Sequence, residues 1–449
     1  MMLMQRSRYA AGRFMASGLM CVALAGCSES ESDSEILLVL NDRQVEAAAV
    51  PIHGRWRTLR SSRIDPTLSD EQRQEIMRLE AIGYLSGSTE ASSRTGVTIY
   101  DVKRAQPGLN FYTSGHAPEA VLMDMEGRVL HRWRADVLSV WPDYPKPWLH
   151  SGAGFWRRAH LDPNGDVIAI FEGLGIIKID KDSNLLWASG VRAHYDLEIL
   201  PNGDVLVLTR EGRVIPRIDV QKPVLEDFVS VLDGGDGHEK QRISLLEAFE
   251  QSEFNAYWNP ATRFFGDLFH TNTLELLDGS IEDTHPEFSA GRVLVSLLIP
   301  STIAVIDLDT GRAVWAKQGD FVRQHDPKVL SNGRLMLFDN GGKRKFSRVI
   351  EFDPEYPDKP IWEYVGDEDS PFYSPSCGTA ERLPNGNTLI TESDGGRAFE
   401  VTPDQEIVWE FYNPHRAEGD DSLIATLFEV VRLSEDFPTA WIPGMGEGD

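Results

Sequence analysis

The sequence predicts an all-β fold, a six-bladed β-propeller, because two kinds of short hairpin alternate along residues 96–412. One kind turns through Asn-Gly or Asp-Gly, which favour the positive φ angles of a tight hairpin. Its copies read LDPNGDVIAI, LPNGDVLVLT, LLDGS, LSNGRLMLF and LPNGNTLIT, and the other kind ends in tryptophan, as in MDMEGRVLHRW, IDKDSNLLWA, IDLDTGRAVWA, FDPEYPDKPIWEY and VTPDQEIVWEF. The turn asparagines lie 38 residues apart at Asn164 and Asn202 and 53 apart at Asn332 and Asn385. Periods of this size, with about four strands each, are typical of propeller blades.

The six blades follow in chain order, and we expect them at 97–134, 150–190, 192–235, 268–318, 323–366 and 375–412. Five of them end in a tryptophan that is expected to pack between blades: Trp133, Trp187, Trp315, Trp362 and Trp409. The third blade has no such tryptophan. The segment TLFEVVRL near the C-terminus is expected to pair with the first blade and close the ring, which removes exposed sheet edges.

Two helical segments interrupt the pattern. SDEQRQEIMRLEAIGYL begins with a capping box from Ser69 to Gln72 and predicts a short N-terminal helix packed on the main domain. Residues 236–266 contain ISLLEAFEQSEFNAYW, which predicts a helical insertion between blades three and four. Two interpretations of this insertion remain open: a roof over the mouth of the central channel, or a helix on the surface.

The N-terminal residues 1–26 have the features of an export signal. Arg6, Arg8 and Arg13 precede an apolar stretch that is too short for a comfortable membrane span. The sequence LAGC that follows resembles a bacterial lipoprotein cleavage site, which would make Cys27 the lipidated N-terminus; a plain secretory signal is the alternative. Ser28, where an Asp would indicate inner-membrane retention, favours the outer membrane. We therefore expect a periplasm-facing lipoprotein of the cell envelope with a signal peptide at 1–26, an acidic tether and N-terminal extension at 27–95, the propeller at 96–435 and a tail at 436–449.

The net charge excludes a nucleic-acid partner, and the cysteine content excludes stabilisation by an intramolecular disulfide. The formal net charge of −26, or −29 without the three arginines of the signal, excludes the basic footprint that a nucleic acid requires. Of Cys21, Cys27 and Cys377, only Cys377 is left as a thiol after export and lipidation, so no intramolecular disulfide can form.

Three histidines lie seven or eight residues before the Asn or Asp of a turn, at the start of a strand. They are His194 in AHYDLEILPNGD, His270 in HTNTLELLDG and His325 in QHDPKVLSNG. In a propeller these equivalent positions face one mouth of the channel, so the sequence predicts a shared site there. Imidazole can act as a nucleophile, a base or a metal ligand near neutral pH. Three interpretations are open: structural polar filling, a three-histidine zinc site, and covalent group transfer.

The motifs, in their order from about Gly96 to Pro414, resemble the bacterial aryl-sulfate sulfotransferases that use a phenolic sulfate as donor. The resemblance rests on AVLMDMEGRVLHRW, HYDLEILPNGDVLVL, DLFHTNTLELL, RVLVSLLIPSTIAVIDLDTGRAVW, QHDPKVLSNGRLMLFDNGG, SRVIEFDP and RLPNGNTLITESDGGRAFEVTPDQEIVWE. It implies a six-bladed propeller, no cofactor, and transfer of a sulfuryl group between an aryl sulfate and a phenol through a sulfated histidine.

By motif, the resemblance assigns the nucleophile to His325, whereas His270 and His194 bind sulfuryl oxygens or move protons. Asn272 and Asp326 are further substrate-binding candidates. Asp326, Asp339 and Asn340 flank the strand of His325 and could orient it or bind a calcium ion, although hydrogen bonding at turns and strand ends is the more ordinary role for them. Cys377 occupies the corresponding slot of blade six and is expected to be a small packing residue rather than a nucleophile.

One position departs from the family pattern. Where the family carries a sulfate-clamping arginine after the Val-Ser dipeptide, this chain has Leu298. Candidate substitutes are Arg348, the one assigned to substrate binding, and also Arg292, Arg263 and Arg323. The loss favours an alternative function, a catalytically lapsed propeller that binds a small molecule or partner protein at the same mouth. A quinoprotein dehydrogenase is a weaker alternative, because no adjacent-cysteine pair or set of calcium carboxylates is recognisable.

Overall fold

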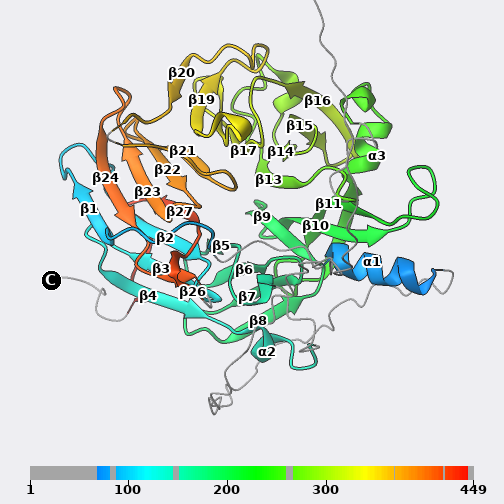
Figure 1. Cartoon of the computed structure of the whole chain (residues 1–449), viewed down its shortest axis with the longest axis horizontal. Coiled ribbons are helices and arrows are strands. Elements are labelled where there is room, and N and C mark those ends of the chain that lie inside the picture. Colours follow the sequence, from blue (N-terminus) through cyan, green and yellow to red (C-terminus); the bar gives the residue numbers. More distant parts are fainter. Residues whose placement is uncertain are drawn as a thin grey trace, which may run out of the picture. The chain divides into compact units, whose positions relative to one another are not determined.

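The computed structural model describes residues 68–80, 87–144, 151–258, 266–368, 370–417 and 420–442, all within one unit, Ala47–Asp449. Its strands form six antiparallel sheets around a common axis, as blades of a propeller (Figure 1). The predicted six-bladed all-β fold is therefore confirmed. We call the end of the ring at which the inner strands begin the mouth.

The first two blades show how the chain builds each sheet from the axis outwards. Blade one consists of β27 (Leu427–Leu433), β2 (Leu109–Ser114), β3 (Glu119–Met123) and β4 (Val129–Arg134). Blade two consists of β5 (Arg158–Leu161), β6 (Val167–Phe171), β7 (Gly175–Ile179) and β8 (Leu185–Ser189). Between them lie α2 (Val137–Val140) and the 3-10 turn η2 (Ser151–Ala153).

Blades three and four repeat this order. Blade three consists of β9 (Ala193–Ile199), β10 (Val205–Arg213), β11 (Val224–Leu232) and β12 (Glu239–Ser244). Blade four consists of β13 (Thr271–Leu276), β14 (Val293–Leu297), β15 (Thr302–Asp307) and β16 (Arg312–Gln318). The connection between β13 and β14 contains the 3-10 turn η5 (Pro286–Phe288), so LLDGS does not form the tight hairpin that its Asp-Gly predicts.

Blades five and six complete the ring. Blade five consists of β17 (His325–Val329), β18 (Leu335–Asp339), β19 (Arg348–Phe352) and β20 (Trp362–Tyr364), with η6 (Gly342–Arg344) before β19. Blade six consists of β21 (Thr379–Arg382), β22 (Thr388–Glu392), β23 (Arg397–Val401), β24 (Ile407–Tyr412) and, on its outer edge, β1 (Gly96–Tyr100). The small pair β25 (Arg416–Ala417) and β26 (Asp420–Ile424) leads into β27.

Both ends of the described propeller cross the closure between blades one and six. β27 pairs antiparallel with β2 as the inner strand of blade one, which confirms the closing role predicted for TLFEVVRL. β1, which the sequence pattern places in blade one, instead pairs with β24 of blade six. This exchange leaves blade one with four strands and gives blade six a fifth. The first strand of the propeller is thus paired with the last blade, and its last strand is paired with the first blade.

The repeated tryptophans join neighbouring blades, as predicted. Four of them lie on outer strands and donate the indole N–H to a carbonyl of the next blade around the ring. These bonds are Trp133 to Gly165 O (2.8 Å), Trp187 to Gly234 O (3.0 Å), Trp362 to Pro403 O (3.1 Å) and Trp409 to Met125 O (2.9 Å). Trp315 is buried and packs edge-on against Phe288 of its own blade, with centroids 5.0 Å apart, and it shares a hydrophobic core with Leu335 and Leu337 of blade five.

The insertion between blades three and four differs from the prediction. Its first part is the strand β12, so blade three extends beyond residue 235, and the helix α3 covers only Leu245–Glu250. α3 begins at the N-cap Ser244, and it buries Leu246 and Phe249 in the core shared by blades three and four. Because α3 lies at the outer side of the ring (Figure 1), it neither roofs the mouth nor sits loosely on the surface.

The N-terminal helix α1 (Asp70–Glu80) begins where its capping box predicts. Ser69 N donates to Gln72 Oε1 (2.9 Å), and Gln72 N donates to Ser69 Oγ (3.1 Å). Gln72 Nε2 also donates to Gln221 O (2.9 Å), and Leu79 is fully buried, which fixes the helix beside blade three.

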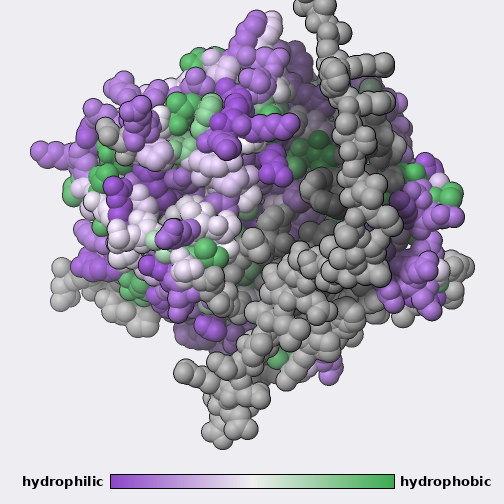
Figure 2. Space-filling view, in the orientation of Figure 1, coloured by the Kyte–Doolittle hydropathy of each residue, from purple (hydrophilic) through white to green (hydrophobic). Residues whose placement is uncertain are grey.

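Hydrophilic side chains are spread over the face of the ring shown in Figure 2, and hydrophobic ones occur there in small groups. Among the described residues, no helix is both long and apolar enough to cross a membrane. The predicted signal peptide, Cys27 and the acidic tether lie outside the described residues.

We predict that Leu427→Ala, in the closing strand, lowers the free energy of unfolding by about 2–5 kcal/mol. Leu427 is fully buried and packs with side chains of blades one and six, so the substitution leaves a cavity at the closure. Denaturant unfolding followed by circular dichroism measures the change. Leu186→Ala, at a side chain that is 36% exposed, is the control with an expected loss below about 1 kcal/mol. Equal losses in the two variants would contradict the closing role of β27.

Candidate active site

The predicted histidines lie at the mouth, but they do not occupy equivalent places. The Oδ2 atoms of Asp196 and Asp326 each accept a hydrogen bond from an inner-strand N–H of the next blade, at 3.1 and 2.9 Å. These two aspartates are therefore equivalent in blades three and five, and the residue before each one is Tyr195 or His325. By these hydrogen bonds Tyr195 corresponds to His325, while the left-handed φ angles at Arg192 and Tyr195, and at Arg323 and Asp326, relate His194 to His325. Residue counting gives the same pair as the hydrogen bonds, because Tyr195 lies seven residues before Asn202 and His325 lies seven before Asn332, whereas His194 lies eight before Asn202. β-bulges interrupt both inner strands at this point.

Tyr195 is the residue that brings the histidines together. The centroid of its ring lies 5.4 Å from the ring of His194, 5.5 Å from that of His270 and 6.3 Å from that of His325. Its backbone has φ +56°, a left-handed conformation that few side chains adopt, and its N–H donates to the buried Glu172 Oε2 (3.1 Å). This strained position, held by a buried carboxylate, directs the phenol into the cluster.

His325 is held in one tautomer. Its Nδ1 lies 2.8 Å from Asn340 Oδ1 and 2.9 Å from Arg323 O. The Asn340 amide nitrogen donates to Ser374 O (2.8 Å) and Cys377 O (2.6 Å), so its oxygen must face the imidazole. Nδ1 therefore carries the proton and donates it, and Nε2 keeps its lone pair.

The imidazole of His325 is also held neutral. Burial lowers its pKa to about 3, and the positive charge of Arg157 contributes to the lowering. The side chain is only 4% exposed. An uncharged imidazole with a free Nε2 lone pair is the form that a nitrogen nucleophile requires.

His270 connects a carboxylate to the phenol of Tyr195. Its Nδ1 lies 2.7 Å from Asp267 Oδ2, and its Nε2 forms a short hydrogen bond with the Tyr195 hydroxyl. Asp267 Oδ1 also accepts from the His270 backbone N–H (2.9 Å), which fixes the chain as it enters β13. The carboxylate, imidazole and phenol form a proton-relay geometry, and the His270 side chain remains 19% exposed.

His194 is placed behind this cluster rather than in it. Its side chain is 1% exposed, and its Nε2 lies 3.6 Å from Asp227 Oδ1. Burial, followed by the charge of Arg210, lowers the pKa of His194 well below its usual value. This neutral, enclosed imidazole packs against the Tyr195 ring and helps to position it, and the substrate-contacting role of His194 stays a prediction.

Arg157 supplies a cation that the sequence analysis missed. It lies just before β5, and its guanidinium carbon is 4.9 Å from the centroid of the Tyr195 ring. Its Nη2 is 3.5 Å from Cys377 Sγ, and its Nε is 3.9 Å from Glu172 Oε2. Arg157 stands seven residues before Asn164, as His325 stands seven before Asn332, so the repeat position contained a signal for it.

Two of the arginines expected to replace the missing cation, Arg348 and Arg292, are engaged with carboxylates. Arg348 is on the third strand of blade five, where it contacts Asp339 Oδ2 (2.8 Å) and the carbonyl of Asp320. Arg292 contacts Asp307, and the side chain of Arg323 is exposed. Arg263 lies outside the described residues. The guanidinium of Arg348 holds the blade in this structure, and its substrate-binding role stays a prediction.

Asn272 and Asp326 act on the backbone. Asn272 Nδ2 donates to Gln324 O (2.8 Å), which steadies the residue before His325. Asp326 accepts from the next blade and lies 3.6 Å from Lys328 Nζ. Asp339 accepts from the N–H groups of Val322 and Gly341 and contacts two arginines. The ordinary hydrogen-bonding role considered for the aspartates is the one observed.

A second polar layer lies farther along the inner strands. Each of the six inner strands contributes one side chain to this layer. In blades two, three, five and six the residue lies four positions before the turn asparagine. The six residues are His160, Glu198, Glu275, Lys328, Glu381 and Glu429. Burial raises the pKa of Glu275 to about 8 and that of Glu381 to about 7. Although burial opposes the charge of Lys328, nearby carboxylates raise its pKa. We call these six residues the acidic layer.

The fold and this site define a six-bladed propeller with a buried, neutral histidine beside a phenol, a proton relay and an arginine at the mouth. The family model described as arylsulfotransferase (ASST) matches residues 158–414, more than half of the chain. The chain belongs to the arylsulfotransferase family. A search of the curated proteins gave no match.

Solved structures resemble the chain at low sequence identity. A protein of unknown function from Bacteroides caccae is 13% identical with a TM-score of 0.45, and the match covers 72% of this chain and 98% of that one. The β-propeller domain of Cps50 (Swd1) from Myceliophteria thermophila is 12% identical with a TM-score of 0.41, covering 73% and 90%. The WD40 β-propeller domain of Doa1 is 13% identical with a TM-score of 0.35, covering 78% and 87%.

We predict that the His325 imidazole stays neutral, with its proton on Nδ1, from pH 8 down to about pH 5. The reason is that its pKa of about 3 lies below the usual 6.5, so the neutral form persists to lower pH. Nitrogen NMR of protein labelled in histidine, with His325→Asn for assignment, distinguishes the two ring nitrogens. Titration of this signal near pH 6.5, or a proton on Nε2, would contradict the assigned tautomer.

Proposed function

We propose that this protein is an exported arylsulfotransferase that moves a sulfuryl group from a phenolic sulfate ester to a phenolic acceptor through a sulfohistidine at His325. The observation that carries the proposal is the neutral His325 imidazole with its lone pair on Nε2, beside the Tyr195 phenol and Arg157. Family membership supports sulfuryl transfer as the reaction class.

In the first step, His325 Nε2 attacks the sulfur of the aryl sulfate. An N–S bond forms, the bond between sulfur and the aryl oxygen breaks, and the electron pair leaves with the phenolate. The leaving oxygen takes a proton from the Tyr195–His270 pair, whose other end is held by Asp267. Asn340 and Arg323 O accept from Nδ1–H and stabilise the charge that develops on the ring.

In the second step, an acceptor phenol attacks the sulfur and the N–S bond breaks. The electron pair returns to His325 Nε2, and the phenol proton passes to the Tyr195–His270 pair, which restores the first state. A phenol with a pKa of about 10 is a weak nucleophile at neutral pH, so a base beside it accelerates this step.

Arg157 takes the place of the family arginine in this proposal. The backbone N–H of Leu298 donates to His270 O (3.3 Å), so an arginine at position 298 would start beside the relay. Arg157 reaches the same cluster from blade two, where its guanidinium lies over the Tyr195 ring. A fixed cation there would bind the non-reacting sulfuryl oxygens, over which negative charge is spread during transfer.

A second candidate function is a lapsed propeller that binds a small molecule or partner protein at the mouth. Leu298 in the place of the family arginine is the observation that favours it. It differs from the first proposal in predicting no chemistry at His325.

For location, we propose a periplasm-facing lipoprotein, with Cys27 as the lipidated residue and the outer membrane as its site. The n-region arginines, the apolar stretch and the sequence LAGC support this. Mass spectrometry of the mature N-terminus is the direct check.

We predict that His325→Asn abolishes acceptor-dependent release of the phenol from a chromogenic aryl sulfate. The variant cannot form the N–S bond, although asparagine keeps a polar group of moderate size in place. Release is followed by absorbance with and without an added phenol. His160→Asn is the matched control, since His160 is an imidazole on the inner strand of another blade and belongs to the acidic layer. Equal background turnover in wild type and both variants would reject the first proposal and favour the lapsed propeller.

We predict that Arg157→Met lowers kcat/KM for the aryl sulfate by about 10²–10³, as expected for the loss of one donor to a developing anion. Arg157→Lys should retain part of the activity, because a charge remains without the planar fork. The matched control is Arg158→Met. It removes the neighbouring guanidinium, which is also buried but contacts Asp196 and Glu429 and not the Tyr195 ring. Equal losses of activity in Arg157→Met and Arg158→Met would indicate that Arg157 acts only on stability.

A further inference from the structure

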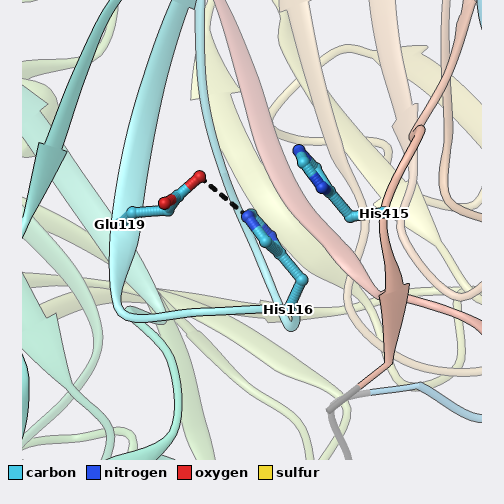
Figure 3. Close-up of side chains that lie close together, drawn as sticks. All are labelled: His116, Glu119 and His415. Atoms are coloured by element: carbon cyan, nitrogen blue, oxygen red, sulfur yellow. Dashed lines mark hydrogen bonds and ion pairs between the residues drawn. The ribbon is translucent and has the colours of Figure 1, made fainter. Parts of the chain in front are cut away.

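A second group of histidines lies away from Tyr195, at the closure of the ring. His116 is in the connection between β2 and β3, Glu119 begins β3, and His415 follows β24 (Figure 3). The Ser114 end of β2 pairs with the start of β27, so this group lies at the mouth end of blades one and six. We call these three residues the closure cluster.

The two imidazoles of the closure cluster lie face to face. Their ring centroids are 3.7 Å apart and their planes differ by 3°. The Glu119 carboxylate points toward His116 (Figure 3), and its Oε1 lies 2.8 Å from His116 Nε2. One donor atom from each residue lies within 4.8 Å of the others. Tetrahedral ligands of one zinc ion lie about 3.3 Å apart, so binding requires one of the two rings to tilt out of the stack until both lone pairs converge.

The nitrogen atoms of the cluster have the chemistry of metal ligands. His415 Nε2 is buried and has no hydrogen-bond partner among the described residues. His116 Nδ1 contacts the Ser114 hydroxyl, the kind of outer partner that orients a ligating histidine whose Nε2 faces the ion.

We propose that His116, Glu119 and His415 form a binding site for a Zn²⁺ ion, which joins blade one to the segment that leads into the closing strand. Two imidazoles and one carboxylate are a ligand set that zinc prefers, with a fourth position left for water. Bound metal stabilises the folded chain because the ligands converge only when the ring is closed.

Two arginines compete with a metal ion for the Glu119 carboxylate, and this competition sets the affinity of the closure cluster for zinc. Arg132 donates to Glu119 Oε1 through a short hydrogen bond, and Arg134 Nη1 lies 3.8 Å from Glu119 Oε2. Both side chains are exposed, so they can leave the carboxylate, but a zinc ion must compete with them. Removal of Arg132 should therefore strengthen metal binding, whereas removal of either histidine should abolish it.

The test uses the full chain, purified without a polyhistidine tag, and ZnCl₂ alone as the probe. Calorimetry and metal analysis after dialysis are expected to give one equivalent of zinc, and zinc is expected to raise the midpoint of thermal unfolding. Cobalt in place of zinc should give the visible absorption bands of a four-coordinate site. His415→Ala should lose all three signals, while Arg132→Ala should bind zinc more tightly than wild type.

Two controls separate this site from others. His238→Ala alters a more exposed group of Asp233, Asp236 and His238, and it should leave zinc binding unchanged. His270→Ala alters the Tyr195 cluster and should also leave it unchanged. Absence of zinc binding, or zinc binding that survives His415→Ala or depends on His270, would overturn the proposal. Since Arg132→Ala removes only an exposed side chain, it tests the site even if His415→Ala folds poorly.

Discussion

The antiparallel pairing of β27 with β2 is the interaction on which the other features depend. It places the last strand of the chain at the axis of the first blade, and β1 completes the exchange by pairing with β24. Without it, the first blade would lack its inner strand and two sheet edges would be exposed. Because the inner strands must meet around one axis, closure also fixes the distance between Tyr195 in blade three and His325 in blade five.

Closure alone does not explain the state of the site, which depends on buried charge. Glu172 accepts from the Tyr195 N–H and stands near both Arg157 and Arg210, at 3.9 and 3.7 Å. Burial raises the pKa of Glu172 even though both arginines oppose the rise. One carboxylate thus holds the strained Tyr195 backbone and keeps a guanidinium beside the phenol. Burial of charges is costly unless they are paired, so this arrangement is better explained by positioning than by stability.

Much of the fold could be predicted from the sequence, because its signals are local. Asn-Gly turns specify hairpins, the spacing of Trp133, Trp187 and Trp409 specifies blades, and Ser69 with Gln72 specifies the start of a helix. The errors arose where partners distant in sequence decide the outcome. The local pattern of β1 is compatible with blade one or blade six, and only its pairing with the free edge of β24 places it in blade six. Residues 239–244 precede a helix, yet β11 recruits them as a strand.

The site was predicted less completely, for a related reason. The repeat position identified His325 and its mouth, but His194 lies eight residues before its turn asparagine, and the residue seven before it, at the spacing of His325, is Tyr195. Arg157 stands at the repeat position of blade two, but a pattern restricted to histidine does not include it. The role of Asn340 depends on carbonyls 34 and 37 residues away, which no local pattern contains.

The charged side chains near the axis differ between the mouth and the part of the ring farther along the inner strands. An anionic sulfate at the mouth meets Arg157, whereas farther along the inner strands it meets the acidic layer. The cations there are already engaged, Lys328 near Asp326 and Arg158 with Asp196 and Glu429. Burial raises the pKa values of Glu198, Glu275 and Glu381 in that layer, so these carboxyl groups resist ionising. If the protein transfers sulfuryl groups as proposed, Arg157 would favour a sulfate ester beside His325, whereas the cations farther along the inner strands are engaged by carboxylates.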